Sequence, residues 1–179
     1  GVMSGRKNED RLRNAIEENC LDVMLLQQPL IGEDLRFVSG AFRIVSDLTH
    51  IDGMTRDIAF LVEEIPGKAS KKLVAEFTEM SECAASMVEQ AGAAFAAADV
   101  EGAQRVVEED NRVNELYDEV EGKLVELIRA GKSSAQYLPE LLMVAKYFER
   151  IGDLAKRVAA WAIFRVTGEH VVEKASQQR

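Results

Sequence analysis

Only three prolines, Pro29, Pro66 and Pro139, interrupt this chain of 179 residues. The long stretches between them are dominated by Ala, Glu, Leu, Lys, Arg and Met, which are the residues with high helix propensity. No run alternates apolar and polar residues as a half-buried strand would. The sequence therefore predicts an all-α protein.

Turn and capping residues divide the chain into five predicted helices. Their ranges are 8–28, 32–64, 68–98, 100–130 and a last helix that starts at 133 or 134 and ends at 167. Asp99 is predicted to cap the fourth helix at its N-terminus, and Gly168 follows the last one. Helices of about 20 to 33 residues joined by short connections form an elongated antiparallel bundle.

Apolar residues recur every seven positions in the two longest predicted helices, which indicates their core-facing sides. These residues are Ile44, Ile51 and Ile58 in the second helix, and Leu141, Phe148, Ala155 and Ala162 in the last.

The chain also repeats itself, because residues 100–166 resemble residues 8–64. Ile151 lies one hundred positions after Ile51, and Val158 one hundred after Ile58. An extra predicted helix, 68–98, precedes the second copy, and nothing stands in that role before the first. A duplication of three-helix units therefore predicts a leading helix absent from this chain and an uncovered apolar edge.

Charge and composition exclude several classes of function. Acidic residues outnumber basic ones by 31 to 22, which gives a net charge of −9 and a pI near 4.9. Nucleic-acid binding needs a basic surface, and no segment is long and apolar enough to span a membrane. Because the N-terminal stretch is polar, we expect no signal peptide in it. The two cysteines, Cys20 and Cys83, form no metal-binding CxxC motif, so we expect buried thiols in a reducing compartment.

Two acid pairs in the second copy are candidate metal ligands. Glu149 and Asp153 are four residues apart, as are Asp110 and Asn114 on the preceding helix, so each pair shares a helical face. If the two helices pack antiparallel, the pairs converge, and oxygen ligands of this kind bind divalent metals. The alternative is a solvated face that pairs with Lys146, Arg150 and Arg157.

The first copy has a poorer set of ligands. Asp47, His50 and Asp57 share one helical face and predict a site with one imidazole and two carboxylates. The alternative is a titrating surface histidine. No catalytic motif of the hydrolase, kinase or metalloprotease type is present, so the sequence predicts a protein that is not an enzyme.

Several short motifs, in order along the chain, resemble the PhoU family of phosphate-transport regulators. Residues 147–153 read Tyr-Phe-Glu-Arg-Ile-Gly-Asp, which is similar to the family signature. Further similar segments are 20–21, 27–29, 34–37, 110–117 and 167–169. The resemblance implies two three-helix repeats, here 1–66 without its leading helix and 67–168, followed by a polar tail, 169–179.

The resemblance also implies a function. Proteins of this family are cytoplasmic, often homodimeric, and act peripherally at the inner face of the membrane. They couple the ATPase subunit of a phosphate ABC transporter to a sensor histidine kinase, and they restrain uptake and the starvation response when phosphate is plentiful. A negative regulator of this kind is the expected function.

The family further implies metal ions such as Fe, Zn, Mn or Mg on the acid pairs of each repeat. Matched by position, these are Glu149, Asp153, Asp110 and Asn114 in the second repeat. The first-repeat equivalents are Thr49, Gly53, Arg6 and Asp10, three of which are not carboxylates. We therefore expect the first site to be lost or displaced to Asp47, His50 and Asp57.

Two other functions remain open at this point. The chain is an accessory protein of a different phosphate or cation permease, or it is a carboxylate-metal helical bundle. The second alternative requires Glu-x-x-His spacing, which the sequence lacks. Arg36 and Phe37, in the turn after the first helix, are either a docking surface or a packed corner.

Overall fold

The computed structural model describes residues 2–67, 71–130 and 136–171, with side chains from residue 7 onward. Within these residues the chain forms long α-helices and no strand, which confirms the all-α prediction. The helices are α1 (Val2–Leu26), α2 (Gly32–Glu64), α4 (Val74–Ala97), α5 (Val100–Arg129) and α6 (Leu138–Thr167).

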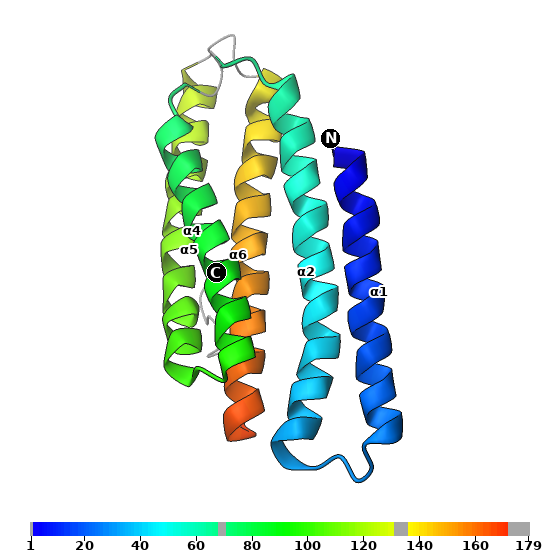
Figure 1. Ribbon diagram of the computed structural model, residues 1–179. Helices are drawn as coiled ribbons and strands as arrows, with labels where there is room; N and C mark the ends of the chain where they lie inside the picture. Colours follow the sequence, from blue (N-terminus) through cyan, green and yellow to red (C-terminus); the bar gives the residue numbers. More distant parts are fainter. Residues whose placement is uncertain (1, 68–70, 131–135, 172–179) are drawn as a thin grey trace.

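The helices lie roughly parallel to one long axis, as predicted for an elongated bundle (Figure 1). Helices α4, α5 and α6 each pack against the other two. Helix α2 packs against α6, and α1 lies at the outer edge against α2. The second half of the chain is therefore a three-helix bundle, and the first half is a helix pair attached to it through α2 and α6.

Most predicted helix ends agree with the structure, and three helices start at other residues than predicted. Asp99 caps α5 by accepting a hydrogen bond from Gly102 N at 2.9 Å, and Gly168 ends α6 in the left-handed conformation. Helix α1 begins at Val2 rather than at residue 8, because no proline separates the two positions and the helix continues through Gly5. Residues 71–73 form a turn and α4 begins at Val74, whereas the predicted start at residue 68 lies outside the described residues.

The last predicted helix begins at Leu138 rather than at 133 or 134, and those two positions lie outside the described residues. Pro139 occupies the first turn of α6, where a missing backbone N–H disrupts no helical hydrogen bond.

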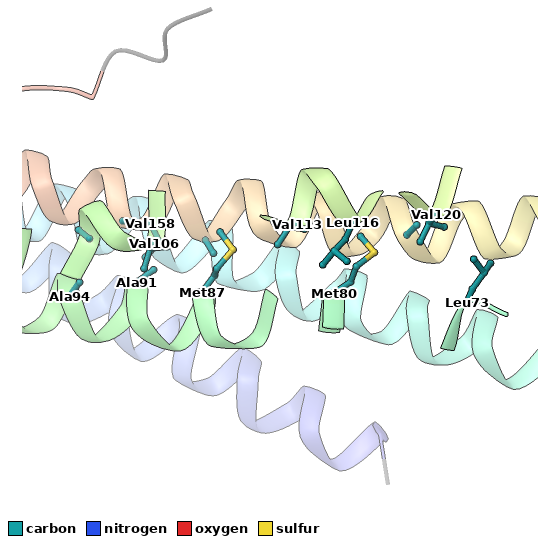
Figure 2. Packing of buried hydrophobic residues seen from close by; sticks show 14 of the residues in the cluster. Leu73, Met80, Met87, Ala91, Ala94, Val106, Val113, Leu116, Val120 and Val158 are labelled. Carbon is teal, nitrogen blue, oxygen red and sulfur yellow. The ribbon is translucent and has the colours of Figure 1, made fainter. Parts of the chain in front are cut away.

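The core lies between α4, α5 and α6 (Figure 2). Met80 and Met87 of α4 point toward Val113 and Leu116 of α5, and all four are buried. Buried alanines on α4 and α6 contribute small side chains to this core. The heptad prediction is confirmed: Ile44, Ile51, Leu141, Ala155 and Ala162 are buried, and Ile58 and Phe148 are half-buried.

The two halves meet at residues that the internal repeat relates. Ile51 of α2 and Ile151 of α6 belong to one small buried cluster, together with Ala84 of α4. The positions that match in sequence therefore lie at the seam where the first helix pair joins the three-helix bundle.

Arg36 and Phe37 both make contacts within the fold, although Phe37 stays 40% exposed. Arg36 Nε donates to the carbonyl of Arg165 at 2.8 Å, so it binds an otherwise free carbonyl at the end of α6. The ring of Phe37 stacks on Phe95 with centroids 5.4 Å apart, and the guanidinium of Arg165 lies 4.4 Å from the Phe37 centroid. These contacts favour the packed-corner interpretation over a docking surface.

The outer helix pair exposes several large apolar side chains. They are Leu12, Ile16, Leu21, Leu25, Leu26, Leu35 and Phe42. In the second half, α4 covers both α5 and α6, whereas the described part of the first half has no such third helix. A leading helix and the division into repeats at residue 66 stay predictions.

No described helix is both long and apolar enough to cross a membrane.

Candidate functional site

The second-repeat candidates lie along the seam between α5 and α6. Asp110 of α5 is only 2% exposed and faces Gly152 of α6. A methyl group added at Gly152 would lie 3.4 Å from Asp110 Oδ1 and 3.5 Å from the side chain of Val113. The glycine thus leaves room for α6 to run close to a buried carboxylate.

The two oxygens of Asp110 have different surroundings. Oδ2 lies 2.9 Å from the ammonium of Lys156 on α6 and accepts a 3.3 Å hydrogen bond from Asn114 Nδ2 on its own helix. Oδ1 is buried, and no described residue donates a hydrogen bond to it. A buried acceptor without a donor is costly, so a cation or a further donor placed beside this oxygen would be stabilising.

The other acid pair lies on α6 and also has a lysine neighbour. Lys146 Nζ lies 2.6 Å from Glu149 Oε2, and its ammonium is 5.0 Å from the ring centroid of Tyr117. Asp153 is exposed at the edge of the seam, where partial loss of solvent raises its pKa above the usual value, and the negative charges of Glu149 and Asp110 raise it further. Lys156 and Lys146 partly oppose this rise in pKa. The seam therefore carries excess negative charge.

The chemistry of these residues suits a hard metal ion, but their arrangement falls short of a complete site. Carboxylate and amide oxygens are the donors that divalent cations such as Mg²⁺ and Mn²⁺ prefer. Among the described residues, no three Asp, Glu, His or Cys side chains gather closely enough to hold a metal. Two of the carboxylates form ion pairs with lysines instead, Glu149 with Lys146 and Asp110 with Lys156.

Lys156 was not predicted as part of this site, although its spacing from the two acids of α6 places it beside them. It lies three residues after Asp153 and seven after Glu149, so it shares their helical face.

In the first half, the structure gives Asp47 a different partner from those predicted. Asp47 is 5% exposed and accepts two hydrogen bonds from Arg157 of α6, one from Nε to Oδ2 at 2.8 Å and one from Nη2 to Oδ1. His50 and Asp57 are exposed on α2. The described residues do not gather these three side chains into a metal-binding group, and the displaced site stays a prediction.

A charged cluster between α1 and α2 was not predicted from the sequence. Arg56 Nη1 lies 2.9 Å from Glu9 Oε2, and Arg56 also pairs with Asp52 one turn earlier. Burial raises the pKa of Asp52, and a hydrogen bond with Glu9 raises it further. Arg56 lies one hundred positions before Lys156, so the internal repeat relates these two basic residues. Each of them pairs with an acid on the preceding helix of its seam, Arg56 with Glu9 and Lys156 with Asp110.

Both cysteines are free thiols, of which Cys20 is buried as predicted and Cys83 is only half-buried, and we expect both to react slowly. Burial, followed by the nearby charge of Glu17, raises the pKa of Cys20. The same cause, with the charges of Glu109 and Glu79, raises the pKa of Cys83. Because the thiolate is the nucleophile, iodoacetamide near neutral pH should modify both thiols several-fold more slowly than in the protein unfolded in guanidinium. Equal rates in the two states, followed by mass spectrometry, would contradict this expectation.

Comparison with known proteins places this architecture in a family. The family model described as PhoU domain matches residues 77–162, which contain all four second-repeat candidates. A phosphate-specific transport system accessory protein PhoU homolog from Clostridium acetobutylicum is 30% identical over 162 residues, covering 90% of this chain and 74% of that protein. A protein of the same description from Aquifex aeolicus is 34% identical over 182 residues, covering 97% of this chain and 80% of that protein. The chain belongs to the PhoU family.

Solved PhoU structures have the same fold. The crystal structure of the phosphate transport system regulatory protein PhoU from Streptococcus pneumoniae matches with a TM-score of 0.83 at 21% identity, covering 96% of this chain and 80% of that one. PhoU from Pseudomonas aeruginosa matches with a TM-score of 0.81 at 22% identity, covering 94% and 80%. The helical arrangement described above is therefore the PhoU arrangement.

Proposed function

We propose that this chain is an accessory regulator of phosphate transport that restrains uptake and phosphate-starvation signalling when phosphate is plentiful. It acts as an adaptor between the ATPase subunit of a phosphate ABC transporter and a sensor histidine kinase. The observation that carries the proposal is the similarity, at 30% and 34% identity over most of the chain, to two proteins named as accessory to phosphate-specific transport.

The physical properties of the chain suit a docking role rather than turnover of a substrate. Its long helices offer extended faces, and its net charge of −9 attracts partners that present basic surfaces. Such attraction speeds association at low ionic strength. We place the protein at the cytoplasmic face of the membrane, held there by its partners and acting as a homodimer.

We also propose that Asp110, Asn114, Glu149 and Asp153 bind a divalent or trivalent metal ion. The buried Oδ1 of Asp110, which no described donor satisfies, supports this assignment, as does the excess negative charge of the seam. A bound ion would supply positive charge between α5 and α6. The proposal is confined to the second repeat, because both oxygens of Asp47 already accept hydrogen bonds from Arg157.

The adaptor role is tested by affinity capture. The purified chain is the bait in detergent extracts of phosphate-replete and phosphate-starved cells of its source, and a helical protein of similar net charge is the control bait. We expect the ATPase subunit of a phosphate ABC transporter and a sensor kinase to be recovered, more strongly from replete cells. Recovery of neither protein in either condition would refute the adaptor role. Recovery of a different permease would show that the chain serves that permease and not the phosphate ABC transporter.

A further inference from the structure

The ammonium of Lys156 already neutralises the most deeply buried acid of the α5–α6 seam. It lies 2.9 Å from Asp110 Oδ2, close enough for a strong charge-assisted contact. Asp110 is only 2% exposed, whereas the side chain of Lys156 is 29% exposed. The carboxylate is therefore fixed inside the protein, while the lysine reaches it from the solvent edge and can be withdrawn into water.

The charge of the seam limits what a metal ion gains there. Asp110, Glu149 and Asp153 contribute three negative charges when ionised, and Lys146 and Lys156 contribute two positive charges. A divalent ion placed beside both lysines would be repelled by them at short range. If Lys156 moves away, Oδ2 of Asp110 keeps only the 3.3 Å hydrogen bond from Asn114, and Oδ1 has no described donor.

The first half of the chain supports the same interpretation independently. Arg56, which the internal repeat relates to Lys156, reaches across the α1–α2 seam to Glu9 at 2.9 Å. In each seam, therefore, a basic side chain of the second helix, α2 or α6, forms an ion pair with an acid of the first helix, α1 or α5. Because two matching positions carry the same kind of partner, a protein cation is a shared feature of both seams.

We propose that Lys156 is the resident cation of the α5–α6 site, holding Asp110 in place of a metal ion. A divalent ion binds tightly only when Lys156 is displaced or absent, so Lys156 sets the metal affinity of this chain. The inference rests on the proposed metal site in the second repeat. It identifies Lys156 as a residue that controls affinity and does not itself bind metal.

The test measures the binding of Mn²⁺, Zn²⁺ and Mg²⁺, each alone, to the whole chain by titration calorimetry. Lys156→Met removes the ammonium and keeps the length of the side chain, and Lys156→Gln is a second neutral variant. Lys156→Arg keeps the charge. Lys72→Met removes one charge from an exposed position outside the seam and serves as the matched control. Circular dichroism confirms that each variant is helical.

We expect the two neutral variants to bind at least one of these ions about tenfold or more tightly than the original chain, because one positive charge close to the ion is removed. Lys156→Arg and Lys72→Met should bind as the original chain does. Adding Asp110→Asn to Lys156→Met should abolish the gain. The ion should also raise the melting temperature of Lys156→Met more than that of the original chain.

Two different results would overturn the inference, and they are distinguishable. Tight and equal binding by the original chain and by Lys156→Met would show that Lys156 does not control affinity, and the proposed metal site would stand. Absence of binding in both neutral variants, with helical structure intact, would refute the metal site as well. Neither result bears on the adaptor role, which the capture experiment measures separately.

Discussion

Replacing Leu116 by alanine is expected to lower the free energy of unfolding by about 2–5 kcal/mol. Leu116 is 1% exposed and lies at the centre of the α4–α5–α6 core, facing Met80 (Figure 2). Truncation removes buried apolar surface and leaves a cavity, because long helices that pack along their whole length cannot close around one missing side chain. Urea unfolding followed by circular dichroism measures the loss.

Ile128→Ala, in the same helix, is the matched control. Ile128 is 59% exposed, so its truncation leaves no buried cavity and should change the free energy of unfolding by about 0.5 kcal/mol or less. The dependence on urea should keep the same slope in both variants, since the surface exposed on unfolding hardly changes. Equal losses for the two variants would contradict the position assigned to the core.

The second large effect is expected at the contact between Asp47 and Arg157, which ties α2 to α6. Arg157→Met leaves the buried carboxylate of Asp47 without two charge-assisted hydrogen bonds. We expect a loss of about 1.5–3 kcal/mol in the free energy of unfolding, since the Arg157 side chain is itself half exposed and water replaces part of the contact. Chemical denaturation of the single variants measures this loss.

A double variant and a surface control make the second test specific. Asp47→Leu together with Arg157→Met should recover part of the stability, because no buried charge is then left unpaired. Arg105→Met breaks an exposed pair with Asp99 at 3.8 Å and should cost about 0.5 kcal/mol or less. A similar cost for Arg105→Met and Arg157→Met would show that the buried contact adds nothing.

Much of the fold was predictable because its signals are local. The three prolines, the cap at Asp99 and the glycine at 168 each act within a few residues of a helix end. The predicted start at residue 68 lies outside the described residues. Helix α4 begins at Val74, after a turn at residues 71–73, and propensity alone does not decide between a turn and a helix there.

The candidate site was predictable only in part. Spacing within one helix correctly put Asp110 beside Asn114, whose side chains share a hydrogen bond. It did not predict the partners that reach across from another helix. One such partner is Lys156, which forms an ion pair with Asp110, and another is Arg56, which forms one with Glu9.

Asp47 and Arg157 show most clearly where the sequence stops and the tertiary structure begins. The sequence determined that both lie on amphipathic helices, because periodicity is set by the geometry of a single helix. It associated Asp47 with its own helical neighbours and Arg157 with the acids of the second repeat. The structure joins them across 110 positions. The rotation and axial position of α2 against α6 decide this pairing, and they follow from the packing of all the apolar faces together, which no single segment contains.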